Sequence, residues 1–192
     1  MDVVARIEAA ASRWNVLDHP FYKRWSAGEL SPGELAEYAA QYRHAVVALA
    51  DAAAAAGNEE HAREEREHVA LWDAFADGCG SLPADPTAET RECAESWTAG
   101  DDRLECIAVL YAIESAQPAI AQTKLEGLIG HYGFEEGPAT EYFTLHAERD
   151  HDHASESREL LEKLATEEDA PRLAARAEAA ARGNWRLLDG VS

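Results

Sequence analysis

The helical spacing of apolar residues constrains this chain more than any other feature of its sequence. Apolar side chains recur every three to four positions along almost the whole chain, and no segment shows the strict alternation of a half-buried strand. Start and stop signals divide this pattern into helices at about 3–17, 31–56, 59–77, 87–98, 101–132, 138–165 and 171–188. We expect Pro118 to kink or break the fifth helix at Gln117. Together with the short segment 21–25, this pattern predicts a single all-α domain over residues 1–192, a bundle of about seven to nine helices.

The helix start at residue 31 carries the clearest local signal. Ser31 is followed by Pro32 at the first helical position and by Glu34 three residues on, which is the pattern of a capping box. Gly57 and Asn58 then end the helix that starts there.

The charge of the chain excludes several classes of partner. It carries 37 acidic and 17 basic side chains, a formal net charge of −20. Nucleic acids and anionic membranes attract basic surfaces, so we expect neither as a partner. Only three basic residues are lysines (Lys23, Lys124 and Lys163), and alanine is abundant. We interpret this composition as a surface adapted to high salt.

Cysteine use and the start of the chain favour a cytoplasmic location. Cys79, Cys93 and Cys106 have unrelated spacings, which predicts reduced thiols rather than a disulfide framework or a metal-binding CxxC motif. The N-terminal segment lacks the basic and apolar regions of a signal peptide. We also expect no apolar run of the length that spans a membrane.

Two short segments repeat the same pattern of histidines and carboxylates. The first reads His61-x3-Glu65-x2-His68, and the second reads His146-x3-Asp150-x2-His153. Positions i, i+4 and i+7 of a helix share one face, so each trio forms a stripe. Facing stripes of this kind build the metal sites of helical bundles. The alternative for either stripe is an exposed helix face rich in ion pairs.

Glu114 adds a third carboxylate in an unusual setting. Its neighbours in the sequence are almost all apolar, and no lysine or arginine lies one helical turn away. A buried carboxylate without a partner is costly, and a metal ion is one way to neutralise it. A protonated core glutamate beside Tyr111 is the alternative.

These residues together suit two metal ions. Three carboxylates and three imidazoles are too many ligands for one catalytic ion, and the mixed nitrogen and oxygen donors favour iron, with manganese as an alternative. We therefore predict a dinuclear Fe(II) site with the ligands Glu65, His68, Glu114, His146, Asp150 and His153. His61 is not needed in this set. Three roles are open for it: a seventh ligand, a partner of a ligand in the outer shell, or a surface histidine.

The same residues carry a resemblance to a known family. The segments HPFYKRWSAGELSPGELAEYAAQYRHAV, EEREHVALWDAF, LYAIESAQ and HAERDHDH resemble the haem-oxygenase-like dimetal oxidases, which share a superfamily with the thiaminase TenA and the oxidase PqqC. The family's ligand order falls on the six predicted ligands. Some members place the first glutamate further upstream, which makes Glu60 and Glu64 rivals of Glu65.

The resemblance implies a haem-oxygenase-like bundle that activates O2 at two Fe(II) ions. The expected substrate is a small organic molecule, similar to an amino acid or a fatty acid, and the expected assembly is a homodimer. Five aromatic residues are candidates for the substrate cavity, although each could equally be plain core: Tyr38, Tyr42, Trp72, Tyr111 and Phe143.

Other functions remain as alternatives. A thiaminase-like aminopyrimidine hydrolase needs a cysteine nucleophile, but Cys106 lies five residues before Tyr111 rather than four. A metal-free oxidase similar to PqqC gives no reason for the repeated histidine stripes. A ferritin-like di-iron bundle accounts for Glu37 and most of the ligands, but not for His146. The last alternative is a non-catalytic interaction protein.

Overall fold

The structure, a computed structural model, describes residues 2–191, with the side chain of Arg149 excepted. It is helical throughout its described part, and it confirms the predicted all-α class. The helices are α1 (Val3–Ala11), α2 (Pro20–Ala27), α3 (Pro32–Ala55), α4 (Glu59–Gly78), α5 (Ala88–Thr98), α6 (Arg103–Glu114), α7 (Gln117–His131), α8 (Glu141–Leu164) and α9 (Ala170–Asp189).

The predicted capping signals operate where they were expected. The Ser31 hydroxyl accepts a hydrogen bond from the backbone N–H of Glu34, and the Glu34 carboxylate accepts one from the backbone N–H of Ser31. This reciprocal pair fixes the first turn of α3. Asn58 caps α4 in a similar way, because its side-chain oxygen accepts from the backbone N–H of His61 at 3.1 Å.

Three helix boundaries differ from the prediction. The first helix ends at Ala11 rather than near residue 17, and two 3-10 turns (Ser12–Trp14 and Val16–Asp18) continue the chain. The break before Pro118 comes earlier than expected, since α6 ends at Glu114 and α7 starts at Gln117. The segment after Pro138 forms a turn first, so α8 begins at Glu141.

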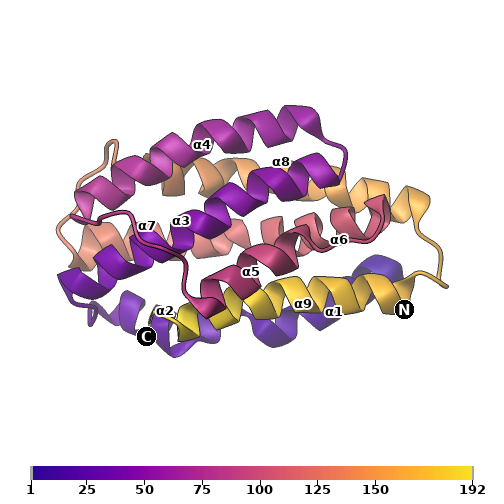
Figure 1. Ribbon diagram of the computed structural model, residues 1–192, viewed down its shortest axis with the longest axis horizontal. Helices are drawn as coiled ribbons and strands as arrows, with labels where there is room; N and C mark the ends of the chain where they lie inside the picture. The colour runs from indigo at the N-terminus through magenta and orange to yellow at the C-terminus, as the bar shows by residue number, and fades with distance from the viewer. Residues whose placement is uncertain (1, 192) are drawn as a thin grey trace.

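The long helices run roughly along the length of the molecule (Figure 1). Helix α4 lies along the top of this view beside α8 and α3, whereas α9 and α1 lie along the bottom. Helix α6 is the centre of the bundle, because it packs against α3, α5, α8 and α9, and every residue from Glu105 to Glu114 is buried. The end of α6 therefore delivers Glu114 to the interior beside α4 and α8.

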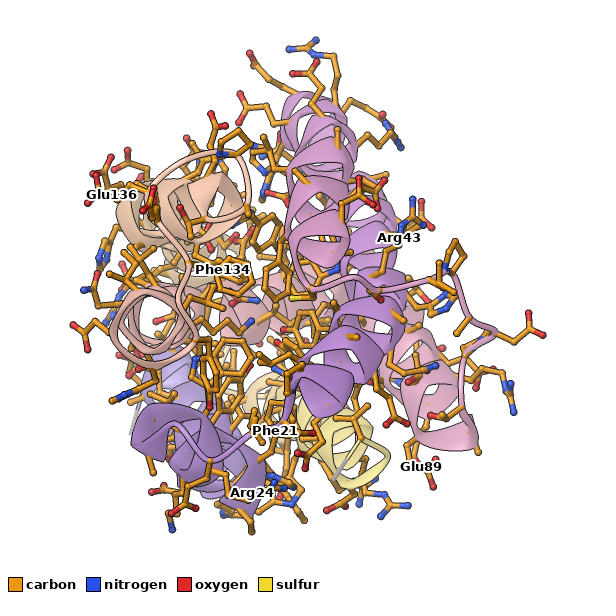
Figure 2. All side chains as sticks on the ribbon, turned by 90° about the vertical axis from the view of Figure 1, so that its left-hand side faces the viewer. Phe21, Arg24, Arg43, Glu89, Phe134 and Glu136 are labelled. Atoms are coloured by element: carbon orange, nitrogen blue, oxygen red, sulfur yellow. The ribbon has the colours of Figure 1, made fainter. Side chains whose placement is uncertain are left out.

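The central helices form the core of the bundle because they are apolar. The stretch Arg103–His131 is long and apolar enough to cross a membrane by length and composition alone, which corrects the expectation that no apolar run approaches that length. In the bundle, 72% of its most apolar window is buried by other helices, as in any core helix. Seen along the bundle, apolar side chains such as Phe21 lie between the helices, and charged ones such as Glu136 lie outside (Figure 2).

Candidate metal centre

Three helices bring the predicted ligands together. Helix α4 carries His61, Glu65 and His68 on one face, the end of α6 carries Glu114, and α8 carries His146, Asp150 and His153. The i, i+4, i+7 spacing turns each stripe toward the other helix. We call these seven residues the ligand cluster. His61 belongs to it, although the sequence left its role open.

Short contacts join the members of the ligand cluster across the three helices. The Nε2 atom of His61 lies 3.0 Å from Oε1 of Glu114 and 3.4 Å from Oε1 of Glu65. The same Glu65 oxygen lies 3.2 Å from Nδ1 of His68. The imidazole rings of His61 and His153 are 3.8 Å apart between centroids, so α4 and α8 meet through their histidines.

The second stripe makes equally short contacts. Nδ1 of His146 lies 3.0 Å from both carboxylate oxygens of Asp150, and Nδ1 of His153 lies 4.0 Å from Oδ1 of Asp150. The ring of His146 faces that of His68 edge-on, with 4.9 Å between centroids. The cluster is thus one continuous set of donors rather than two separate helix faces.

Unpartnered polar atoms show that a cation fits this cluster. Among the described residues, eight buried side-chain nitrogen or oxygen atoms have no hydrogen-bond partner, and six of them belong to the ligand cluster. They are His61 Nε2, Glu65 Oε2, both carboxylate oxygens of Glu114, His146 Nε2 and His153 Nδ1. Proteins rarely leave such atoms unsatisfied, because each costs free energy comparable to a lost hydrogen bond. Metal ions would satisfy all six.

Burial and mutual repulsion also leave the carboxylates in need of a cation. Burial raises the pKa of Glu114 well above its usual value, and the charges of Asp150 and Glu65 raise it further. Glu114 is moreover the last residue of α6, where the helix dipole disfavours a negative charge. Burial opposes ionisation of Glu65 as well, but the adjacent imidazoles of His61 and His68 outweigh it and hold the pKa of Glu65 well below its usual range.

The histidines respond to the same surroundings in opposite directions. Burial lowers the pKa of His68, but the Glu65 carboxylate beside it outweighs burial and raises the pKa overall. Burial and the neighbouring His61 lower the pKa of His153, which keeps that imidazole neutral and able to bind a metal.

The donors fall into overlapping groups that could each hold an ion. His61, Glu114 and His153 form one group, and Glu65, His68 and His146 form a second, with ligand atoms within 4.8 Å of one another in each. Glu65, Asp150 and His153 form a third group that connects the first two. Four imidazoles and three carboxylates make a donor set that suits iron or manganese.

The rival glutamates lie at the edge of this arrangement or beyond it. Glu60 is exposed and lies 3.7 Å from Arg63 on the same helix. Glu64 is partly buried at the edge of the cluster, with its Oε2 atom 3.4 Å from Nε2 of His153. Glu65 is fully buried at the centre, so the structure places Glu65 rather than either rival among the other donors.

An aromatic cage lies beside the ligand cluster. The Nζ atom of Lys124 lies 4.4 Å from the centre of the Tyr42 ring and 5.5–5.8 Å from four further rings, so that the cage consists of Tyr22, Tyr38, Tyr42, Trp72 and Phe143. Lys124 is fully buried and makes no hydrogen bond through this amine to any described residue, and burial lowers its pKa to about 7. We call this group the Lys124 cage.

The Lys124 cage and the ligand cluster share helices α4 and α8. Trp72 lies one turn beyond His68, and Tyr142 lies one turn before His146. The Tyr142 ring contacts His146 at 4.1 Å and Trp72 at 5.0 Å between centroids, and it therefore links the two groups.

Four of the five residues predicted for the cavity belong to this cage. Tyr111 lies elsewhere, because its hydroxyl donates a hydrogen bond to Glu8 of α1 at 2.6 Å and no ring contact joins it to the cage in the described part of the chain. Cys106 is not an activated nucleophile, since burial and the charges of Asp102 and Glu105 raise the pKa of its thiol.

Sequence reasoning missed three residues of this region: Tyr22, Lys124 and Tyr142. Tyr142 continues the stripe of α8 by one turn, at i−4 from His146, which is a signal that the spacing could have provided. Lys124 is one of only three lysines and lies in an apolar helix, but a single charged residue is usually a surface residue. Nothing in the sequence near Tyr22 indicates its neighbours from α3 and α7.

The chain matches a known protein family and several known proteins. The family described as iron-containing redox enzymes matches residues 35–185. Proteins named 4-aminobenzoate synthase are similar over most of their length. The protein from Chlamydia muridarum is 30% identical over 88% of this chain and 81% of its own, and that from Chlamydia trachomatis serovar D is 28% identical over 98% and 91%. The protein from Nitrosomonas europaea is 28% identical over 97% and 89%.

Solved structures with the same arrangement of helices are more distant in sequence. A TenA homologue from P. horikoshii OT3 superposes with a TM-score of 0.81 at 14% identity, covering 100% of this chain and 98% of its own. A domain of unknown function with a haem-oxygenase-like fold, from Shewanella denitrificans OS217, superposes with a TM-score of 0.80 at 18% identity, covering 100% and 92%.

Proposed function

Because this chain belongs to the family of iron-containing redox enzymes with a haem-oxygenase-like fold, we propose that it is a di-iron oxidase that uses O2 to form 4-aminobenzoate. The family and the fold confirm the predicted resemblance and the predicted oxidase class. They also decide against the ferritin-like and the non-catalytic alternatives.

The unpartnered atoms of the ligand cluster carry the proposal. His61, Glu114 and His153 would hold one ion, and Glu65, His68 and His146 would hold the other, with Asp150 between the two groups. Iron bound there supplies the electrons and open coordination positions that a reaction with O2 needs. Neither a hydrolase nor a metal-free oxidase accounts for six unsatisfied donor atoms in one place.

Buried aromatic residues exclude water from one side of the ligand cluster. Trp72, Tyr142 and Phe143 are buried and separate the cluster from solvent on the side of the Lys124 cage. The low pKa of Lys124 keeps about half of its amine uncharged near pH 7, so the amine can both accept and donate a proton there. Aromatic walls beside such an amine suit a small aromatic compound better than a fatty acid.

The relatives' name supports the choice of product. Proteins named 4-aminobenzoate synthase match 88–98% of this chain, and 4-aminobenzoate is itself a small aromatic amino acid. Of the two substrate classes that we predicted, the name favours the amino-acid-like class. We also propose a homodimer, which the family resemblance supports, in the cytoplasm, which the three free cysteines support. The net charge of −20 supports the proposal that it binds neither nucleic acid nor membrane.

Growth of a 4-aminobenzoate auxotroph tests this function without knowledge of the substrate. The gene, expressed in a bacterial strain that lacks its own 4-aminobenzoate synthesis, is expected to restore growth in medium without the compound. His146→Ala removes one ligand and is expected to abolish growth, and added 4-aminobenzoate must rescue that strain. Growth that depends on neither the gene nor His146 contradicts the proposal.

A second measurement tests the oxidase reaction and the identity of its product separately. Purified protein is loaded with Fe(II) without oxygen and then mixed with O2 and a reductant, and 4-aminobenzoate is quantified by mass spectrometry. If O2 is consumed in proportion to iron but no 4-aminobenzoate forms, the oxidase class stands and the product assignment is wrong.

A further inference from the structure

A polar hollow opens beside the ligand cluster at the start of α4. Its volume is about 290 Å³, and it is lined by Asn58, Glu60, His61, Glu64, His153 and Glu156. All six lining residues are polar, and three of them are glutamates. We call this hollow the acidic vestibule. It lies between the first two turns of α4, the helix along the top of Figure 1, and the middle of α8.

The floor of the acidic vestibule consists of donors from the metal centre. His61 and His153 line the hollow and also belong to the ligand cluster. His61 is 97% buried, and its Nε2 atom lacks a hydrogen-bond partner while lying 3.0 Å from Oε1 of Glu114. A small cation that crosses the vestibule therefore reaches an unsatisfied ligand, and the ligand atoms of Glu114 and His153 lie within 4.8 Å of it.

The rim of the vestibule is negatively charged. The Glu60 side chain is 79% exposed, and Glu156 is exposed on α8. Glu64 lies deeper, 3.4 Å from Nε2 of His153, and so continues the line of carboxylates from the rim to the floor. Two arginines lie near this rim: the Arg63 guanidinium is 64% exposed and lies 3.7 Å from Glu60, and Arg103 lines an adjoining hollow together with Asn58 and Glu156. Carboxylates at a concave opening attract a divalent cation and repel an organic anion.

A second hollow of different chemistry is lined by Ile113 and Ser115, the chain neighbours of Glu114, but by no member of the ligand cluster. Its volume is about 270 Å³, and α1, the junction of α6 and α7, and α9 line it with mainly small or apolar side chains such as Ala112, Ile113, Ile120 and Ala180. An organic molecule gains hydrophobic free energy there, but not among the glutamates of the vestibule.

We propose that the acidic vestibule is the route by which a divalent metal ion reaches the ligand cluster from solvent. This inference rests on the proposed di-iron function. Glu60, Glu64 and Glu156 attract the ion, and His61 and His153 accept it from them.

The test follows metal uptake rather than catalysis. The metal-free protein is mixed with Co(II), and the visible absorbance of the bound ion is recorded against time. In Glu60→Gln/Glu156→Gln we expect uptake to be about tenfold slower at low ionic strength, since focused charge accelerates association by such factors. We expect the final number of bound ions to stay the same, because neither residue belongs to the ligand cluster. Raising the salt concentration is expected to abolish the difference.

Two matched variants separate local from global charge. Glu135→Gln/Glu136→Gln removes the same charge from the α7–α8 turn, at the opposite end of α4 from His61 (Figure 2), and is expected to leave the uptake rate unchanged. Asn58→Asp adds a charge to the vestibule and still caps α4, because an aspartate oxygen accepts from the His61 N–H as the asparagine oxygen does. We expect uptake in Asn58→Asp to be about two- to threefold faster.

Each outcome decides the inference. Equal rates in the parent protein and Glu60→Gln/Glu156→Gln overturn it, and so does equal slowing in Glu135→Gln/Glu136→Gln. If the rim variant does not fold, as judged by circular dichroism, the rate in Asn58→Asp decides alone. A parent protein that binds no Co(II) at equilibrium contradicts the metal centre itself, whereas normal binding with unaltered rates contradicts only the vestibule.

Discussion

Replacing Lys124 by methionine is expected to stabilise the metal-free protein, and more so at pH 6 than at pH 9. The Lys124 amine is fully buried among five aromatic rings and makes no hydrogen bond to a described residue. Methionine has a similar length and keeps the packing of the Lys124 cage without a charge.

The magnitude follows from the pKa of Lys124. Burial lowers it from 10.5 to about 7, and at 1.36 kcal/mol per pH unit this fall corresponds to about 5 kcal/mol of destabilisation below pH 7. We therefore expect Lys124→Met to raise the free energy of unfolding by about 5 kcal/mol at pH 6.

The pH dependence has a definite sign. Between pH 7 and pH 10.5 the unfolded chain binds more protons at this lysine than the folded chain, so the parent protein gains stability as the pH rises through this range. The variant lacks this gain. The difference between the two proteins is expected to shrink by about 3 kcal/mol from pH 6 to pH 9.

Urea unfolding of both metal-free proteins at pH 6 and pH 9 checks these values. Lys23→Met at the exposed position on α2 serves as the control, and is expected to change stability by less than about 0.5 kcal/mol. If Lys124→Met is no more stable than the parent protein at pH 6, the amine has a partner in solution and the reasoning about the cage is wrong.

Three further predictions concern packing, charge and salt. A Cβ atom at Gly127 would meet the Nε1 and Cδ1 atoms of the buried Trp25, whose indole N–H donates a hydrogen bond to the Lys124 carbonyl. Gly127→Ala is therefore expected to lower the free energy of unfolding in urea by about 2 kcal/mol. At Gly130 the Cβ position is open, so Gly130→Ala serves as the control and is expected to lower it by no more than about 0.3 kcal/mol. The pKa of Glu114 is raised in the folded state, so its contribution to the stability of the metal-free protein is present below its usual pKa and is lost as the pH rises. Glu114→Gln is expected to flatten this part of the plot of unfolding free energy against pH. An unchanged plot would contradict the burial of an ionisable group at this position. Finally, a net charge of −20 predicts that the thermal midpoint rises between 0.1 and 2 M KCl, and a midpoint that stays constant would exclude a surface adapted to salt.

The sequence predicted which side chains of the ligand cluster lie close together because its information is local. The i, i+4, i+7 spacing places three side chains on one face of a helix whatever the rest of the fold does, and two such faces occur in α4 and α8. The apolar surroundings of Glu114 were likewise visible in the sequence. The contact between His61 and Glu114 was not visible in the sequence, because only the packing of α6 against α4 and α8 brings Glu114 to within 3.0 Å of the His61 Nε2 atom.

The Lys124 cage could not be predicted because it depends on tertiary packing. Its rings come from α2, α3, α4 and α8, and the amine comes from α7. Tyr111 shows the same limit from the other side, since an aromatic residue on the central helix α6 lies against α1 and not in the cage. Helix ends were missed where turn geometry competes with helical spacing, as in the 3-10 turns after Ala11.

The number of iron ions that the protein binds tests the metal centre most directly. Metal-free protein is titrated with Fe(II) without oxygen, freed of loose metal on a desalting column and analysed for iron by mass spectrometry. We predict two equivalents for the parent protein and one or fewer for His146→Ala, because His146 contributes an unsatisfied Nε2 atom to the second group of ligands. Less than one equivalent in the parent protein, with no change in His146→Ala, would contradict a dinuclear centre in this fold.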